Sequence, residues 1–268
     1  EICLDIPSNG ATENLMMAAV LAEGDTVIEN AAKDPEIEDL ANFLNACGAK
    51  IEGAGSHKIK ITGVSLDDLH SAEHTAIPDR IEAGSFILSV LATKGKATFT
   101  NVIPEHLTSL TSKLEDIGAN IEYPSENVII VSSDIRLSSV ELSTVWYPGF
   151  PTDLQPQLMA LLCLSEGTSI IKETIYEDRF SHVEELSRMG ANINVNHNVA
   201  LVNGVEKLSG ASVCGSDLRA TAGLISAGLS ADDLTKVRGL SHLDRGYSKF
   251  EEKMQSLGAD IVRVEVEK

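Results

Sequence analysis

The segment PGFPTDLQPQ, residues 148–157, holds one carboxylate, Asp153, directly ahead of the apolar run LMALLCL. Three prolines and a glycine restrict the backbone around this carboxylate. The apolar run predicts a buried helix, and the N-terminus of a helix favours a negatively charged side chain. Asp153 is therefore either an ordinary helix cap, which is the commoner outcome, or a base that is held in a fixed position.

Four arginines stand at corresponding positions of an otherwise acidic chain: Arg80, Arg179, Arg219 and Arg245. Two lie at the start of apolar helices, and two lie at the start of charged helices. A guanidinium group binds phosphate and carboxylate in a bidentate manner. Isolated Asp–Arg pairs are usually structural, but four arginines at equivalent edges of repeated segments indicate a site for anions.

Helix caps are the simplest interpretation of the other polar residues at these helix starts. Asp79 and Asp217 each precede an apolar helix, where an aspartate side chain accepts hydrogen bonds from free N–H groups. The segment before the first apolar helix consists of Pro7, Ser8, Asn9 and Gly10. A turn with a cap is the favoured interpretation of this segment, and a backbone cradle for phosphate is the functional alternative.

The cysteines and histidines show no pattern that is typical of metal ligands. The four cysteines are far apart in the sequence: Cys3, Cys47, Cys163 and Cys214. The seven histidines do not occur in metal-binding spacings. We therefore expect reduced thiols in a cytoplasmic protein, with neither a metal nor a cofactor.

A short motif divides the chain into four similar units. Gly-Ala followed by a polar residue and Ile begins at Gly48, Gly118, Gly190 and Gly258, at spacings of 70, 72 and 68 residues. In each unit an apolar helix precedes a β-rich run, a charged helix that ends at the glycine, and alternating strands. Short strands such as EICLDI, VELSTVWY and SVCGS lead into the units. The pattern predicts an α/β fold of βαβαββ units with the apolar helices inside and the sheets outside.

Composition limits the kinds of partner. The chain has 268 residues, a formal net charge of −19 and 4% aromatic residues. An acidic surface repels nucleic acid and anionic membranes, and no apolar run reaches the length of a membrane span. We expect small-molecule ligands, no nucleic acid and no membrane.

Several longer strings resemble the bacterial UDP-N-acetylglucosamine enolpyruvyl transferase (1-carboxyvinyltransferase) family. They are PSNGATENLMMAAVLAEG, ENAAKDPEIEDLANFLNACGAKI, PDRIEAG, PGFPTDLQPQ, EDRFSHVEELSRMGA, SDLRATAGLISAGL and HLDRGY. The resemblance covers essentially the whole chain. It implies an inside-out α/β barrel, the enolpyruvyl transferase fold, with four of its six units present. Residues 1–77 would be one unit of an incomplete domain, and residues 78–268 would form a three-unit domain.

The resemblance also implies a reaction, the first committed step of peptidoglycan synthesis. An enolpyruvyl group would pass from phosphoenolpyruvate to the 3-hydroxyl of UDP-N-acetylglucosamine, with release of phosphate. Asp153 matches the family's general base, Arg219 and Arg245 match arginines that bind phosphoenolpyruvate, and Asp217 lies beside them. The positions that match substrate contacts or acidic positions near the interdomain cleft are Pro7, Ser8, Asn9, Gly10, Glu36, Asp79, Ile175 and Arg179. Asn9 departs from the apolar residue that is commoner in the family.

The chain also departs from the family in what it lacks. The loop that carries the general acid, a Cys or an Asp, has no counterpart in these 268 residues. The first unit begins within ten residues of Glu1 and nothing resembles a capping unit, so we expect the chain to begin mid-protein. We expect it to be inactive without a missing N-terminal segment of the same enzyme.

Two alternatives remain open. One is a non-catalytic module that keeps only UDP-sugar recognition. The other is the related 3-phosphoshikimate enolpyruvyl transferase, which shares the fold but not the strings PGFPTDLQPQ and PSNGATEN.

Overall fold

The computed structural model describes residues 1–264, which form two compact units. The first unit contains Glu1–Pro78 together with Trp146–Gly149, and the second contains Asp79–Val145 together with the described chain from Phe150 onward. No helix within residues 1–264 is both long and apolar enough to cross a membrane. The assignment of residues 1–77 and 78–268 to two domains of a larger fold stays a prediction.

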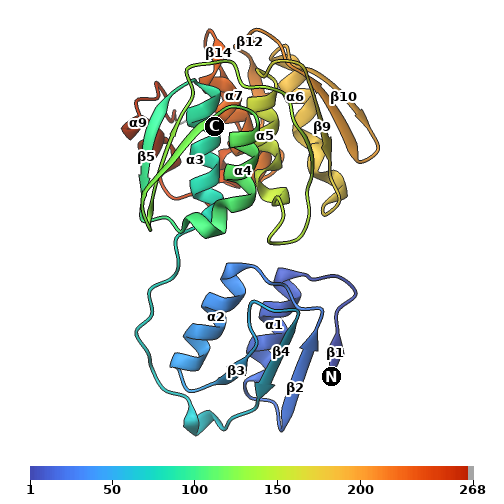
Figure 1. Cartoon of the computed structure of the whole chain (residues 1–268), viewed down its shortest axis with the longest axis vertical. Helices are drawn as coiled ribbons and strands as arrows, with labels where there is room; N and C mark the ends of the chain where they lie inside the picture. Colours follow the sequence, from blue (N-terminus) through green and yellow to red (C-terminus); the bar gives the residue numbers. More distant parts are fainter. Residues whose placement is uncertain (265–268) are drawn as a thin grey trace. The chain divides into compact units, whose positions relative to one another are not determined.

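The first unit contains one βαβαββ repeat (blue to cyan in Figure 1). Its sheet has the strand order β1-β2-β4-β3, with β1 parallel to β2 and the other pairs antiparallel. The elements are β1 (Ile2–Cys3), α1 (Asn9–Ala19), β2 (Asp25–Glu29), α2 (Pro35–Ala46), β3 (Lys50–Glu52), β4 (Lys58–Thr62) and the 3₁₀ turn η1 (Leu66–Asp68).

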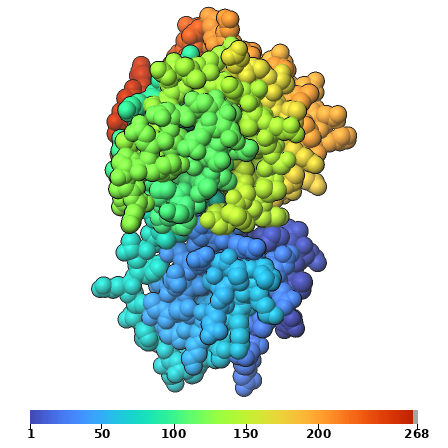
Figure 2. Space-filling model, in the orientation of Figure 1, coloured from blue at the N-terminus to red at the C-terminus, as the bar shows by residue number. Residues whose placement is uncertain are grey.

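The apolar residues of the first unit lie between its helices and one face of its sheet. Alternate residues of β4, Ile59 and Ile61, are fully buried, as the period of two in a strand requires. Helix α1 buries Met16 in the same apolar cluster. Met17, also in the helix, and Leu21, which lies just beyond its end, are each about half exposed. The space-filling view shows one face of residues 1–78 of this unit, coloured blue to cyan (Figure 2). The sequence predicts that α1 is buried inside the fold, but within this unit only one side of the helix is buried.

Three apolar helices form the interior of the second unit (Figure 1). They are α3 (Arg80–Ala92), α5 (Gln155–Leu162) and α7 (Leu218–Leu229), and each contacts the other two. All eight residues of α5 are buried, so this helix has no polar face to expose. The other helices of this unit lie nearer the surface: α4 (Thr108–Asp116), α6 (Val183–Arg188), α8 (Leu240–Leu243) and α9 (Phe250–Ser256).

Sheets cover the outside of these helices. The first is three-stranded with the order β5-β7-β6, and the second is four-stranded with the order β10-β11-β9-β8. Two short parallel pairs, β12-β14 and β13-β15, complete the set. The bounds are β5 (Lys96–Thr100), β6 (Asn120–Ser125), β7 (Val128–Ser132), β8 (Glu141–Ser143), β9 (Thr168–Lys172), β10 (Asn192–Asn196), β11 (Val199–Asn203), β12 (Leu208–Ser209), β13 (Ser212–Cys214), β14 (Ala231–Asp232) and β15 (Lys236–Arg238). The predicted arrangement of inner helices and outer sheets is confirmed.

The fourth repeat is the one that departs from the predicted order of elements. In the third repeat the strand after the charged helix, β10, pairs with β11. In the fourth repeat residues 259–264 follow α9 without forming a strand, and no second strand lies beside them in the described chain. An isolated strand leaves its N–H and C=O groups unpaired, so it does not form alone. A cavity of about 700 Å³ lies beside this segment, between α3, α7 and α9.

Gly223 allows α7 to pack closely against α5. A Cβ atom built at this glycine would lie 2.8 Å from the carbonyl oxygen of Pro156. We expect Gly223→Ala to lower the free energy of unfolding of the second unit by about 1–3 kcal/mol, because the backbone of α5 must move. Urea unfolding followed by circular dichroism measures the change.

Gly10 serves as the control for this prediction, since a Cβ atom there would meet nothing within 4 Å. Gly10→Ala should leave stability unchanged or raise it slightly, because alanine favours the helix. An equal and large loss of stability in both variants would show that close packing of α7 against α5 at Gly223 does not cause the loss in Gly223→Ala.

Candidate active site

Asp153 lies in the short 3₁₀ helix η3 (Thr152–Leu154), which runs into α5. Pro151 precedes η3, and Pro156 occupies an early position of α5, where a missing N–H group does no harm. The Asp153 side chain makes no capping hydrogen bond to the start of either helix in the described chain. The interpretation of Asp153 as an ordinary cap is therefore wrong, because its oxygens bind side chains instead.

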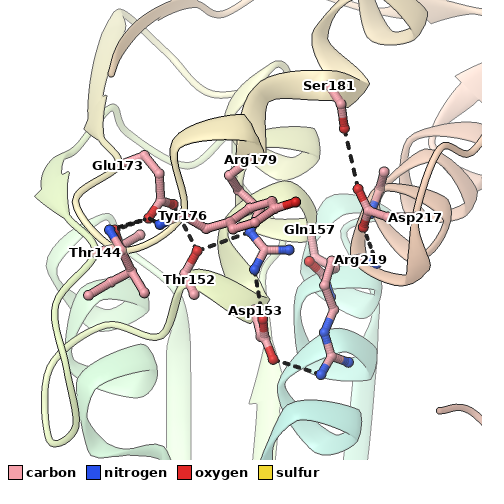
Figure 3. A network of polar contacts seen from close by, with 12 residues as sticks. Thr144, Thr152, Asp153, Gln157, Glu173, Tyr176, Arg179, Ser181, Asp217 and Arg219 are labelled. Carbon is pink, nitrogen blue, oxygen red and sulfur yellow. Dashed lines mark hydrogen bonds and ion pairs between the residues drawn. The ribbon is translucent and has the colours of Figure 1, made fainter. Parts of the chain in front are cut away.

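The Asp153 carboxylate lies between two arginines (Figure 3). Its Oδ1 accepts a hydrogen bond of 2.9 Å from Nη2 of Arg179, and its Oδ2 accepts one of 2.7 Å from Nη2 of Arg219. The two guanidinium side chains are 10% and 19% exposed, whereas the Asp153 side chain is 36% exposed. The carboxylate is thus open to a ligand, while the arginines approach it from the protein side.

Polar groups of the inner helices support Arg219. Its Nη1 lies 3.5 Å from the hydroxyl of Tyr247, which is within 2.7 Å of the Ser85 hydroxyl. The Gln157 amide donates to both of these hydroxyls. Burial is the largest influence on the pKa of Arg219 and lowers it, but the charges and hydrogen bonds of Asp153 and Tyr247 together outweigh burial, so the pKa is raised and the guanidinium stays charged. Burial also raises the pKa of Tyr247, which therefore stays a neutral phenol.

Asp217 and Asp79 do cap helices, as predicted. Asp217 Oδ1 accepts the N–H groups of Arg219 and Ala220 at 2.8 and 3.0 Å. Asp79 Oδ1 accepts those of Ile81 and of the next residue at 2.8 and 3.0 Å. For Asp217, burial is the largest influence and raises the pKa, but the two backbone hydrogen bonds, the Arg179 charge and the Ser181 hydroxyl together outweigh it, so the pKa is lowered. Asp217 is therefore a charged cap that fixes the first turn of α7, from which Arg219 projects.

Two other predicted residues of the second unit, Ile175 and Arg245, make no hydrogen bond or ion pair with Asp153 or its two arginine partners in the described chain. Ile175 is half-buried, and its N–H donates to the carboxylate of Glu173 at 2.9 Å. Arg245 is exposed in the loop after α8, and its side chain makes no hydrogen bond or ion pair within residues 1–264. The structure therefore brings together Asp153, Arg179 and Arg219, but it does not bring Arg245 to them.

In the first unit the predicted residues surround the starts of α1 and α2. The Ser8 hydroxyl accepts the N–H of Ala11 at 3.3 Å, which confirms the cap. Pro7 and Asn9 are half-buried and Gly10 is exposed. The side-chain oxygen of Asn9 is buried without a hydrogen-bond partner in the described chain.

Acidic residues of α1 and α2 lie close to one another in this unit. Partial burial raises the pKa of Glu13, and the charges of Glu36 and Asp34 raise it further. The backbone N–H of Ala32 donates to the Thr12 hydroxyl at 3.0 Å, which holds the first turn of α1 against the segment before α2. Glu36 therefore belongs to an acidic group at these helix starts.

The contacts also include residues that the sequence did not single out. The buried carboxylate of Glu173 binds the hydroxyls of Thr144 and Thr152, and Thr152 in turn binds Arg179. Tyr176 stacks on Arg179, with the guanidinium carbon 4.7 Å from the ring centre. Only the position of Glu173, directly after a predicted strand, could have pointed to this group.

His182 is a buried histidine next to this group. Its Nδ1 lies 3.0 Å from the carbonyl oxygen of Arg179, and its Nε2 has no partner within the described residues. Burial lowers its pKa from the ordinary 6.5 to about 4. We expect stability to be lost as the pH falls from 6.5 to 4, by on the order of 3 kcal/mol, because the unfolded chain gains a proton that the folded chain does not.

Unfolding by urea at several pH values tests this expectation for His182. His182→Gln should flatten the pH dependence between pH 6.5 and 4, whereas His197→Asn should not, since His197 is exposed in the turn between β10 and β11. An unchanged slope in His182→Gln would show that other groups cause the acid sensitivity.

The four cysteines are free thiols, and none is joined to Asp153 by a contact in the described chain. Burial raises the pKa of Cys163, the residue directly after α5, to about 12. A thiol of this kind is packed in the core and is a poor proton donor at neutral pH.

Comparisons with known proteins agree on one family. The sequence profile of EPSP synthase (3-phosphoshikimate 1-carboxyvinyltransferase) matches residues 1–254. The chain is 55% identical to UDP-N-acetylglucosamine 1-carboxyvinyltransferase 2 of Carboxydothermus hydrogenoformans over 98% of this chain and 62% of that protein. It is 52% identical to the enzyme of the same name from Bacillus subtilis, over 98% of this chain and 61% of that protein.

The comparison with a solved structure agrees with the sequence comparisons. The enolpyruvyl transferase NikO from Streptomyces tendae superposes with a TM-score of 0.85 at 28% identity, over 95% of this chain and 60% of that one. The fold of the chain is therefore that of the enolpyruvyl transferases. The chain spans about three fifths of the length of the relatives that it matches.

Proposed function

Because the chain belongs to the EPSP synthase family of carboxyvinyl transferases, we propose that it supplies the Asp153 site of an enzyme acting on UDP-N-acetylglucosamine. The reaction transfers the enolpyruvyl group of phosphoenolpyruvate to the 3-hydroxyl of the sugar and releases phosphate. The observation that carries this proposal is the partly exposed Asp153 carboxylate between Arg179, which is buried, and Arg219, which is half-buried. The names of the relatives support the choice of UDP-N-acetylglucosamine as the acceptor.

The reaction needs a base, an acid and cations. The sugar oxygen attacks C2 of phosphoenolpyruvate while C3 gains a proton, which gives a tetrahedral adduct. Loss of phosphate from C2 and of a proton from C3 then restores the double bond. Asp153 takes the hydroxyl proton in the first step, for which a positioned carboxylate is suited. The family resemblance assigns protonation of C3 to a Cys or Asp on a loop without a counterpart in these residues.

The arginines supply the cations in this proposal. Arg219 and Arg179 bind the phosphate or carboxylate of phosphoenolpyruvate, since guanidinium groups pair with both. The Asp153 carboxylate accepts one hydrogen bond from each of the two guanidinium groups. A bound anion then competes with Asp153 for them and frees its oxygens for the sugar hydroxyl. Arg245, which is exposed, remains a proposed phosphoenolpyruvate ligand on the strength of the resemblance.

Several parts of the proposal rest on the family alone. The substrate contacts of Pro7, Ser8, Asn9, Gly10, Glu36, Asp79, Asp217 and Ile175 are of this kind. A role in peptidoglycan synthesis and a cytoplasmic location belong to the same proposal.

Calorimetry with two acceptors tests the choice of substrate. UDP-N-acetylglucosamine should bind to the chain and to the protein as its gene encodes it, whereas shikimate 3-phosphate should not. The reverse preference would assign the protein to the shikimate reaction. Binding of the UDP-sugar by the gene-encoded protein without any release of phosphate from phosphoenolpyruvate would favour the non-catalytic binding module.

A further inference from the structure

Glu173 is a buried acidic residue that the proposed reaction does not use directly. It follows the last residue of β9 and is 2% exposed. Its Oε1 accepts hydrogen bonds from the backbone N–H groups of Ile175 and Tyr176 at 2.9 and 3.1 Å. The carboxylate thus closes the turn that leads from the sheet into η4 (Glu177–His182), on which Arg179 lies.

The same carboxylate joins the two parallel strands β8 and β9. Thr144 follows the last residue of β8, and its hydroxyl donates to Oε1 of Glu173 at 2.6 Å. Ser143 and Lys172 are paired in the sheet, so Thr144 and Glu173 leave neighbouring strands at the same edge. The rigid end of the sheet therefore fixes the position of the Glu173 carboxylate.

A hydroxyl relay connects Glu173 to Arg179 (Figure 3). The Thr152 hydroxyl donates to Oε2 of Glu173 at 3.0 Å and accepts the Nε–H of Arg179, also at 3.0 Å. A hydroxyl that donates to a carboxylate is polarised and becomes a better acceptor. The Thr152 oxygen is thereby oriented toward Arg179, whose Nη2 then reaches Asp153.

A second route runs through Tyr176. The N–H of Tyr176 is held by Glu173, and its ring lies over the guanidinium of Arg179. The two routes fix different parts of Arg179, because the relay binds Nε and the ring covers the face of the guanidinium.

From these contacts we infer that Glu173 is a positioning residue that holds the Arg179 guanidinium against Asp153 through Thr152. For catalysis, the inference rests on the proposed function. The geometric part concerns only Glu173, Thr152 and Arg179, and it can be tested without any reaction.

The sharpest variant is Glu173→Gln. The N–H groups of Ile175 and Tyr176 keep an oxygen at the position of Oε1, so the new amide nitrogen faces Thr152. That nitrogen donates instead of accepting, which reverses the first link of the relay and leaves the turn intact. Thr152→Val removes the relay hydroxyl with little change in shape, and Thr144→Val removes the anchor on β8 without touching the relay.

Two measurements test the inference. Hydrogen exchange of the Arg179 Nε–H in the chain, followed by ¹⁵N NMR and assigned with Arg179→Lys, should become about tenfold faster in Glu173→Gln and Thr152→Val. In the protein as its gene encodes it, both variants should lower kcat about tenfold and change KM for UDP-N-acetylglucosamine less than about twofold. The double variant should be no slower than either single one, because both changes break the same relay. Thr144→Val should retain slow Nε–H exchange.

The outcomes separate the two proposals. Unchanged Nε–H exchange in Glu173→Gln and Thr152→Val would overturn the positioning role, whatever the activity. Additive losses of kcat in the double variant would also overturn it, since the residues would then act independently. Faster exchange in a protein that transfers no enolpyruvyl group would support the geometric role of Glu173 and refute the proposed function.

Discussion

Asp153→Asn should lower kcat for enolpyruvyl transfer about a thousandfold and leave binding of UDP-N-acetylglucosamine within about threefold of the unchanged protein. The amide has the shape of the carboxylate but cannot take the hydroxyl proton. Binding of the UDP-sugar should persist because the proposed function assigns most of its contacts to other residues. Phosphate release at saturating substrate measures kcat, and calorimetry measures binding, both in the protein as its gene encodes it.

Asp244→Asn is the matched control for this prediction. Asp244 also pairs with an arginine, Arg263, at 2.7 Å, but its side chain is 48% exposed and shares no hydrogen bond or ion pair with Asp153 in the described chain. This substitution should leave kcat unchanged, since an exposed pair contributes little. If Asp153→Asn weakened UDP-sugar binding as strongly as it slowed turnover, Asp153 would be a structural residue and not the base.

Arg219→Lys should lower kcat/KM for phosphoenolpyruvate about a hundredfold. The ammonium keeps the charge but loses the planar fork that binds phosphate or carboxylate through two N–H groups. The half-buried side chain also packs against the Tyr247 ring, so lysine cannot make the same contacts. Initial rates of phosphate release over a range of phosphoenolpyruvate concentrations measure the loss.

Arg238→Lys provides the comparison for Arg219→Lys. Arg238, at the end of β15, is exposed and donates to the Ser212 hydroxyl at 2.9 Å. Its replacement should leave kcat/KM unchanged. A loss in Arg219→Lys no larger than in Arg238→Lys would remove Arg219 from the substrate site, while thermal unfolding of both variants checks that each remains folded.

The repeats allowed most of the fold to be predicted from the sequence. The motif at Gly48, Gly118 and Gly190 marks a glycine that ends a helix with positive φ, and each of these glycines has φ between 91° and 105°. Local periodicity therefore located the helices and hairpins of three repeats. It failed in the fourth, where Gly258 also has positive φ but no strand follows it among the described residues. A strand depends on its neighbour, which the local sequence does not specify.

The site was predicted less completely, for the same physical reason. Asp153 is 26 residues from Arg179 and 66 from Arg219, so no local pattern could show that it binds both. Its place ahead of an apolar helix favoured a cap, yet the tertiary contacts with the arginines prevailed. The role of Glu173 was invisible because a single acidic residue after a strand is common, and only the fold brings Thr144 and Thr152 to it.

Product analysis is the most direct measurement of whether the Asp153 site belongs to a UDP-N-acetylglucosamine enolpyruvyl transferase. The protein as its gene encodes it is incubated with phosphoenolpyruvate and UDP-N-acetylglucosamine, and the products are identified by mass spectrometry and NMR. We predict a UDP-sugar that carries a carboxyvinyl ether on its 3-oxygen, with one phosphate released per product, and neither product in Asp153→Asn. The absence of this ether, together with transfer to shikimate 3-phosphate under the same conditions, would contradict it.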